Sequence, residues 1–204
     1  MDEITIKGCP FAMQTDDIWE QQYWNLRENR IFFIDYEIDD NYALMELSKA
    51  IVELNVKEKN IPVDELKPIQ LWIMCFGGDT FQAKFFCSLV EASRIPIITI
   101  ATGAAMSAGL LLLLSGKRRY AFKQSEVLIH QGYATFSGSA QEIEAAQESY
   151  KKQIKVMKEY ILGHTKISES LFKKQEKKDW YVTGDELVTL GIVDKIVTDF
   201  SDMV

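Results

Sequence analysis

Short apolar runs alternate in the first half of the chain with segments in which apolar residues recur at helical spacing. The runs at residues 30–36, 69–75 and 95–101 are rich in β-branched and aromatic residues, which is typical of strands. Residues 43–56 and 80–94 follow two of these runs with the spacing of helices. Strands that are apolar throughout and alternate with helices are typical of a mostly parallel sheet covered on both faces. The pattern predicts an α/β fold.

The second half of the chain continues this alternation. The expected elements are an apolar helix that opens within residues 102–109 and runs to 114, strands at 119–122 and 127–130, helices at 139–163, 168–174 and 184–190, and a strand at 192–197. No linker rich in Pro, Gly or Ser divides the chain. We expect an N-terminal arm over residues 1–29, with a short helix at 16–27, followed by one domain over residues 30–204.

Composition and charge exclude several classes of protein. The chain has 204 residues, of which 47% are apolar and 26% charged, so low-complexity disorder, collagen and coiled coil are excluded. Lys and Arg total 23 against 30 Asp and Glu, a net charge of -7, which argues against a dedicated nucleic-acid binder. The longest apolar run, residues 104–114, is far shorter than the roughly 20 residues of a membrane span. The acidic start, Met1-Asp2-Glu3, does not resemble a signal peptide.

The three cysteines and two histidines are too few and too scattered for a metal site or a disulfide framework. We therefore expect a cytoplasmic protein that needs no metal and no cofactor, and that has no nucleic-acid or membrane partner.

Two predicted strands end in glycine-bearing turns that begin helices. One turn is Phe76-Gly77-Gly78, and the other leads from Gly103 to Ser107. Carboxyl ends of parallel strands meet at one edge of a sheet, where ligands bind. Glycine brings main-chain N–H groups close to a ligand, and a helix N-terminus adds partial positive charge. The two turns could form an oxyanion hole, although each could also merely connect its elements.

Ser107 and His130 are the candidate reactive residues. Ser107 stands in an otherwise small or apolar stretch, and His130 ends the apolar strand that begins near Val127. The path between them, a helix and two short strands, can return the chain to the same edge of the sheet. Both residues also have a structural interpretation. Ser107 could be a helix N-cap or a small residue that fills space, and His130 could be a structural histidine at the end of a strand. A nucleophile requires a base within hydrogen-bond reach.

Several motifs occur in an order that resembles the proteolytic subunit of the Clp protease family. They are Gly77-Gly78, Gly103-x-Ala-x-Ser107-x-Gly109, Leu128-Ile-His130-Gln131, Gly138-x-Ala-x-Glu-Ile-Glu144, His164-Thr165, Asp179-Trp180 and Leu190-Gly-Ile-Val-Asp-Lys-Ile196. The resemblance covers roughly residues 30–197. It implies a ClpP/crotonase-like fold with a handle at about residues 132–163, made of a strand and a long helix, which joins two rings face to face.

The resemblance also implies a serine endopeptidase. Ser107 matches the nucleophile and His130 the general base, while the N–H groups of Gly78 and Ala108 match the oxyanion hole. Two segments, Asp79–Thr80 and Tyr133–Ala134, match strands that pair with an extended substrate. The family forms a barrel of two heptameric rings, which is fed short or unfolded polypeptides by a AAA+ unfoldase.

The chain departs from the family pattern at several positions. A count from His164-Thr165 to Asp179-Trp180 places Gln175 where the family has its triad aspartate, with Glu176 as an alternative. A glutamine amide can orient an imidazole but carries no charge. Cys75-Phe76, Met106 and Gly132 also replace the family's usual residues and could reshape the pocket. The family's usual axial loop is not visible in residues 1–29, whereas Trp72 matches an aromatic of the family's docking pocket or belongs to the core.

These observations leave three functions open. The first is a serine endopeptidase that uses Ser107, His130 and Gln175 inside an oligomeric chamber. The second is an attenuated or inactive ring subunit that acts with a partner, as Gln175 suggests. The third is a crotonase-like acyl-CoA enzyme, which shares the two-peptide oxyanion hole but has no use for a Ser-His pair.

Overall fold

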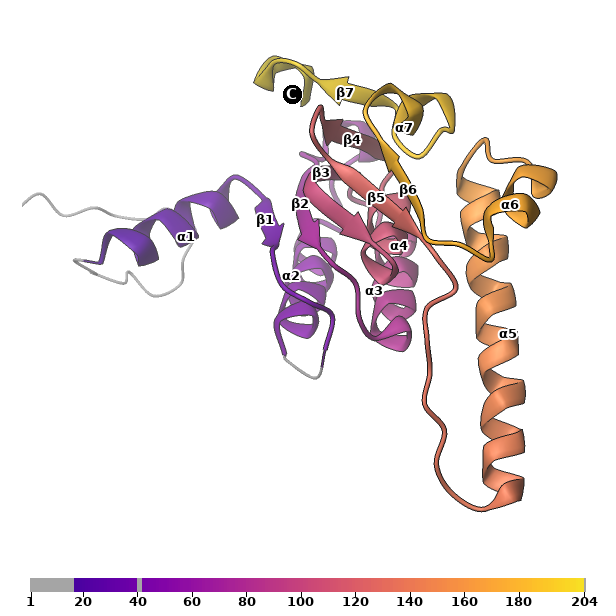
Figure 1. Cartoon of the computed structure of the whole chain (residues 1–204). Helices are drawn as coiled ribbons and strands as arrows, with labels where there is room; N and C mark the ends of the chain where they lie inside the picture. Colours follow the sequence, from indigo (N-terminus) through magenta and orange to yellow (C-terminus); the bar gives the residue numbers. More distant parts are fainter. Residues whose placement is uncertain (1–16, 40–41, 204) are drawn as a thin grey trace, which may run out of the picture.

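The computed structural model of the chain describes residues 17–39 and 42–203 (Figure 1). Its elements in chain order are α1 (Ile18–Glu28), β1 (Ile31–Ile34), α2 (Ala43–Lys57), the 3₁₀ turn η1 (Val63–Glu65), β2 (Ile69–Cys75), α3 (Thr80–Ala92), β3 (Ile97–Met106), α4 (Ala108–Leu114), β4 (Arg118–Phe122), β5 (Glu126–Ile129), α5 (Ala140–His164), α6 (Glu169–Gln175), β6 (Trp180–Thr183), α7 (Asp185–Thr189), β7 (Lys195–Val197) and the 3₁₀ turn η2 (Phe200–Met203). The alternation of strands and helices confirms the predicted α/β class.

The strands form one seven-stranded sheet around β3. The order β1-β2-β3-β4-β7 is parallel at every step. The ten-residue β3 pairs with β4 along its first half and with β5 along its second half, from Ala104 to Met106. The remaining strand, β6, runs antiparallel to β5. The sheet is therefore mostly parallel, as predicted, with one antiparallel strand at the β5 edge.

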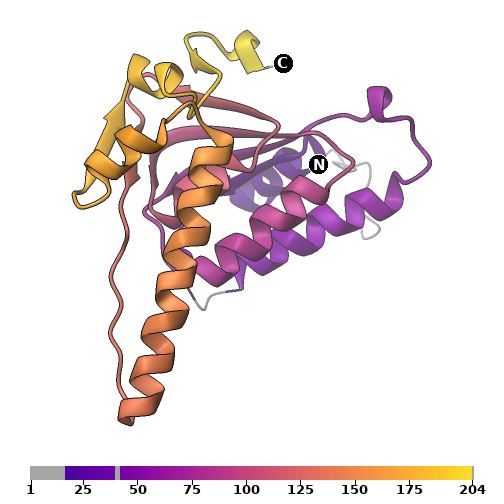
Figure 2. The ribbon, with the colours of Figure 1, turned by 90° about the vertical axis from the view of Figure 1, so that its right-hand side faces the viewer.

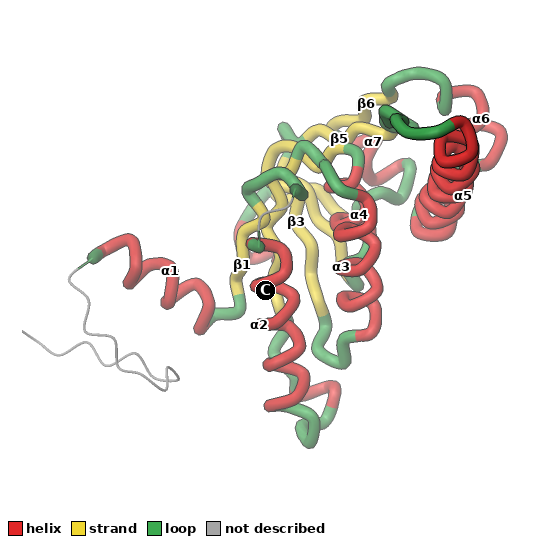
Figure 3. The backbone as a smooth tube through the Cα atoms, turned by 90° about the horizontal axis from the view of Figure 1, so that it is seen from below, coloured by secondary structure: helices red, strands yellow, loops and turns green. Residues whose placement is uncertain are grey.

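Alternating side chains on β3 separate the two faces of the sheet. Ile97 and Ala101 belong to the large core cluster beneath α2, α3 and α4, which lie along one face (Figure 3). Ile98 and Ile100 point to the other face and belong to a smaller cluster with Tyr120, Val197 and Met203. The C-terminal turn η2 supplies Met203 to this second cluster. Helices therefore cover one face, and the C-terminal segment covers part of the other.

The structure differs from the predicted elements in three segments. Residues 102–106 do not open a helix, because they continue β3 and pair with β5, so α4 begins only at Ala108. Residues 180–183 form β6, which the sequence pattern had not indicated. Residues 130–137, expected to supply the strand of the handle, form no regular element within the described chain.

The long helix of the predicted handle is α5. Ser139 and Glu142 begin it with a capping box, in which each side chain accepts a hydrogen bond from the other residue's main-chain N–H. Ile161, in the last turn, is the helix's one buried residue. Figures 1 and 2 show the amino-terminal half of α5 projecting away from the sheet. The body of the domain therefore holds this helix by its carboxyl half.

Within the predicted arm, residues 1–16, with Cys9 and the Cys9-Pro10-Phe11 loop, lie outside the described residues. The helix predicted at 16–27 is confirmed as α1, which begins after the N-cap Asp17 and contacts β1. Figure 1 shows α1 extending away from the sheet. The division into an arm (1–29) and a domain (30–204) stays a prediction.

Candidate active site

Two turns pack against each other at the carboxyl ends of β2 and β3. Gly77 and Gly78 follow β2 with φ values of +111° and +130°, which side chains rarely adopt. A Cβ atom on Gly77 would lie 2.8 Å from the Cβ of Ser107, and one on Gly78 would lie 1.9 Å from the carbonyl oxygen of Ile38. Only glycine fits here, so the two turns lie in direct contact.

Ser107 occupies a sharp turn between β3 and α4. Its φ of 54° and ψ of -120° are strained for a residue with a side chain, and Arg30 is the other non-glycine residue with positive φ in the described chain. The Ser107 N–H donates to the carbonyl of Leu128 at 3.0 Å, which ties the turn to β5. The Ser107 hydroxyl makes no capping hydrogen bond to α4. The structure therefore does not use this serine side chain as an N-cap.

The main-chain N–H groups of Gly78 and Ala108 are available as donors. Ile38 donates to the Gly77 carbonyl at 2.7 Å and accepts from the Asp79 N–H, so in this parallel bridge the Gly78 N–H faces the opposite side. Ala108 is the first residue of α4, where a helix leaves its N–H groups unpaired. The Cβ position of Gly77 lies 3.3 Å from the Ala108 nitrogen. The geometry suits an oxyanion hole.

Asp179 is the acidic residue beside His130. Its Oδ1 lies 3.7 Å from His130 Nδ1, and the register of the antiparallel β5–β6 pair, with Ile129 opposite Trp180, explains this contact. His130 follows β5 and Asp179 precedes β6, so the same register brings them together across the strands. The His130 side chain is 20% exposed and that of Asp179 is 62% exposed.

The role predicted for Gln175 stays a prediction, because the described chain shows no hydrogen bond between Gln175 and His130. Gln175 ends α6, and no side-chain hydrogen bond of this residue occurs in the described chain. The Gln175 carbonyl instead accepts from the Lys178 N–H within the turn that follows α6. The register of β6 instead places Asp179 opposite His130, which makes Asp179 a second candidate for the acid.

His130 Nε2 is buried and has no hydrogen-bond partner within the described residues. In a Ser-His pair this nitrogen is the atom that accepts the serine proton. The hydrogen bond to Ser107 is therefore not formed in the single chain, although the register of β3 with β5 brings the two turns together. Catalytic hydrogen bonds are often long in unliganded enzymes and tighten with substrate.

The segments expected to pair with a substrate differ from each other. Asp79 is the N-cap of α3, and its side chain accepts from the Gln82 N–H. Thr80 is the first residue of that helix, so the prediction of a strand at Asp79–Thr80 was wrong. Tyr133 and Ala134 lie in the exposed segment 131–137, and 93% of Tyr133 is exposed.

Two adjoining hollows lie beside the candidate reactive residues, between α3, α4 and α5. The smaller, of about 30 Å³, is lined by Thr80 after the Gly78 turn, Leu111 one helical turn beyond Ser107, and Gln131 next to His130. The larger, of about 210 Å³, shares Leu111 and continues toward Tyr160. Both hollows are lined mainly by apolar atoms, and neither is lined by Ser107 or His130 itself.

The cysteines of the described chain are structural. Cys75 and Cys87 are buried and free. Burial raises the pKa of both thiols, to about 12 for Cys87, so both stay protonated and unreactive near neutral pH. No group of three or more residues that could hold a metal occurs in residues 17–39 and 42–203. None of the helices in those ranges is both long and apolar enough to cross a membrane.

Comparison with known proteins agrees with this geometry. The chain belongs to the Clp protease family, since the family described as Clp protease matches residues 14–200. The chain is similar to the ATP-dependent Clp protease proteolytic subunit of Deinococcus radiodurans. The two are 25% identical over 177 residues, which cover 86% of this chain and 83% of that protein.

Proposed function

We propose that the chain is a serine endopeptidase that hydrolyses peptide bonds in short or unfolded polypeptides. The observation that carries this proposal is the strained turn at Ser107, packed against the Gly77-Gly78 turn beside His130 and Asp179. A side chain held at positive φ, with unpaired N–H groups on either side, is typical of a nucleophile built into a strand-to-helix turn.

In the proposed mechanism, Ser107 Oγ attacks the scissile carbonyl while His130 Nε2 takes its proton. The N–H groups of Gly78 and Ala108 donate to the oxyanion as it forms. Asp179 faces His130 Nδ1, keeps the proton on that nitrogen and stabilises the imidazolium. His130 then returns its proton to the leaving amine, and water repeats the cycle on the acyl-enzyme.

The substrate chain is proposed to lie along residues 131–137. This segment is exposed and forms no ladder within the described chain, so Tyr133 and Ala134 can offer their main-chain groups to an extended peptide. Pairing of this kind recognises the peptide backbone, and cleavage is then weakly sequence-specific.

Labelling with a fluorophosphonate tests the proposed nucleophile. We expect modification of Ser107 in the purified, assembled protein and loss of both labelling and peptide hydrolysis in Ser107→Ala. Ser115, a buried serine at the end of α4 whose hydroxyl donates to the Leu112 carbonyl, is the control and should stay unlabelled. A protein that hydrolyses peptides while Ser107 remains unmodified would refute the assignment.

The second candidate is a subunit that works only within a ring with a different, active partner. The uncharged Gln175 suggests this function, and the unformed hydrogen bond at His130 Nε2 also favours it. The purified chain is assayed alone and after mixing with an active family member. Robust hydrolysis by the chain alone excludes this candidate, whereas hydrolysis that requires mixing supports it.

We further propose that the chain assembles into homo-oligomeric rings, two stacked heptamers, that dock a AAA+ unfoldase through an aromatic patch. This patch consists of Phe33, Trp72, Phe122 and Phe200, whose rings contact one another with centroids 5.5 to 6.3 Å apart. Trp72 is only half-buried, and Phe33 and Phe200 are exposed, so the patch is more than a core cluster. An exposed aromatic cluster is typical of an interaction site.

The Phe200→Ser substitution tests this patch. Phe200 is 66% exposed, so its loss should leave the fold and peptide hydrolysis unchanged while unfoldase-driven degradation of a folded protein falls at least about tenfold. Phe81→Ser, at an exposed phenylalanine of α3 outside the patch, is the matched control. Equal degradation by the Phe200→Ser variant and the original chain would exclude docking at this patch.

A further inference from the structure

Two hydrogen bonds join α5 to the turns that carry the proposed base and oxyanion donor. Tyr150 Oη donates to the carbonyl of Gln131, the residue after His130, at 3.0 Å. Thr80 Oγ1, two residues beyond Gly78, donates to Gln153 Oε1 at 3.2 Å. Tyr150 and Gln153 are three residues apart and share one face of the helix. One helix face therefore contacts both sides of the candidate active site.

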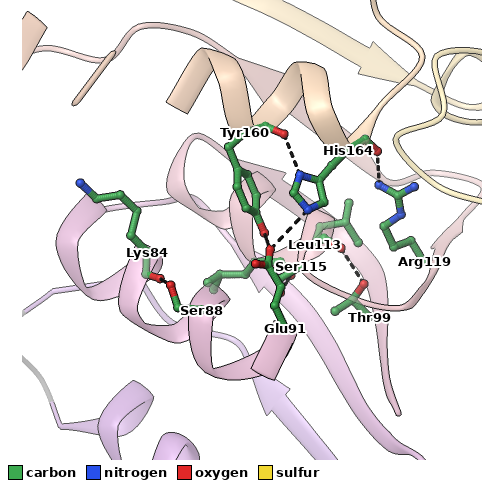
Figure 4. Close-up of polar contacts among 10 residues, drawn as sticks. Lys84, Ser88, Glu91, Thr99, Leu113, Ser115, Arg119, Tyr160 and His164 are labelled. Atoms are coloured by element: carbon green, nitrogen blue, oxygen red, sulfur yellow. Dashed lines mark hydrogen bonds and ion pairs between the residues drawn. The ribbon is translucent and has the colours of Figure 1, made fainter. Parts of the chain in front are cut away.

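The carboxyl half of α5 is anchored to α3. Tyr160 Oη donates to Glu91 Oε1 at 2.5 Å, and His164 Nε2 lies 3.3 Å from the same oxygen (Figure 4). Burial raises the pKa of Tyr160, so its hydroxyl keeps the proton that it donates. The His164 carbonyl also accepts from Arg119 Nη1 at 2.5 Å. Tyr150 lies ten residues before Tyr160, about 15 Å along the helix. The anchor thus fixes the direction in which Tyr150 and Gln153 point.

The segment after His130 has few other restraints. Gly132 has a φ of +73°, and residues 131–137 form no regular element. The Phe136 ring contacts that of Tyr150 with centroids 5.8 Å apart. The imidazole makes one weak polar contact, to Asp179 at 3.7 Å, and its buried Nε2 has no hydrogen-bond partner in the described chain. On the amino side of His130 the main chain is held by the pairing of Ile129 with Trp180, and on the carboxyl side the hydrogen bond from Tyr150 holds Gln131.

We propose that Tyr150 and Gln153 are positioning residues for catalysis. Tyr150 holds the His130 segment and Gln153 holds the Gly78 turn, each through one hydrogen bond. The inference rests on the proposed peptidase function.

The central test is Tyr150→Phe in the full-length assembled protein. This substitution removes the hydroxyl and retains the ring that contacts Phe136. With a fluorogenic peptide, we expect kcat to fall about tenfold while KM stays within about twofold, the effect expected when one hydrogen bond that holds a catalytic group is lost. The melting temperature and the oligomeric state should stay unchanged, and the rate of Ser107 labelling should fall in parallel with kcat.

Two comparisons separate positioning from a merely structural role. Tyr23→Phe removes the hydroxyl of an exposed tyrosine of α1, outside the candidate active site, so kcat should stay within about twofold of the original value. Gln153→Leu removes the acceptor for Thr80 and should lower kcat, whereas Gln153→Glu retains an acceptor oxygen and should restore it. The two variants at Gln153 also keep the inference testable if Tyr150→Phe does not fold.

The inference is overturned if Tyr150→Phe and Gln153→Leu both keep the original kcat. It is also overturned if their kcat values fall only together with the melting temperature. Failure of the proposed function gives a different result, because the unaltered protein would then neither hydrolyse peptide nor react at Ser107.

Amide hydrogen exchange in residues 131–137 gives a readout that does not depend on activity. Exchange should accelerate in Tyr150→Phe and not in Tyr23→Phe, and an unchanged rate in Tyr150→Phe would count against the inference.

Discussion

The Asp179→Asn substitution is expected to lower kcat by about 10⁴-fold, the cost of the equivalent change in other serine protease triads. Asp179 Oδ1 is the acidic oxygen beside His130 Nδ1, at 3.7 Å. Asparagine preserves the shape of the residue but removes the charge that stabilises the imidazolium, and its amide can hold the ring in the wrong tautomer. Peptide hydrolysis by the assembled protein measures the effect. Because Asp179 is mostly exposed, the melting temperature should change little.

Gln175 supplies the matched control. Gln175→Ala should leave kcat within about twofold, and Gln175→Asp should not raise it, because the residue at the end of α6 is not the one that faces Nδ1. A large gain in Gln175→Asp would restore the assignment based on the sequence count. A fully active Asp179→Asn protein would show that the acid plays no part in hydrolysis.

Gly78→Ala should destabilise the fold and abolish hydrolysis. The new Cβ would lie 1.9 Å from the Ile38 carbonyl oxygen, at a φ of +130° that alanine rarely adopts. The turn must move, which we expect to cost about 3 kcal/mol of unfolding free energy and about 6–12 °C in melting temperature. Displacing an oxyanion donor lowers kcat by a further factor of about 10² to 10³. Thermal unfolding and peptide hydrolysis measure the two effects.

Gly163→Ala is the matched control for this substitution. Gly163 lies in the last turns of α5 with no atom within 4 Å of the added Cβ. Alanine is a better helix former, so the free energy of unfolding should rise by about 0.5–1 kcal/mol with hydrolysis unchanged. If Gly78→Ala were as stable and active as Gly163→Ala, the described contact between the Gly78 turn and Ile38 would be wrong.

The strands of the parallel part could be predicted because each is a compact apolar run. β2 was predicted at its observed bounds, and α3 and α5 were predicted to within a few residues. Their signal is local, since buried strands need apolar residues and amphipathic helices need periodic ones. The continuation of β3 to Met106 could not be predicted in this way, because small residues such as Gly103 and Ala104 favour no structure strongly. Pairing with β5 decides it.

The acid of the candidate site could not be assigned by counting. Asp179 was noted within a family motif, but its contact depends on β6, whose four residues Trp180–Thr183 were not identified as a strand. The burial of Trp180 and Val182 between exposed Tyr181 and Thr183 is the alternating signal that would have revealed it. Once the antiparallel pairing with β5 is known, the position opposite His130 is Asp179 and not Gln175.

The main chain holds the two residues of the proposed catalytic pair unequally. Ser107 directly continues β3, the central strand that pairs on both sides, whereas His130 begins a segment without regular structure. Warming should therefore disturb the imidazole long before the hydroxyl is displaced. Turnover would fade reversibly over a range of temperatures in which the sheet is intact, and cooling would restore it without refolding.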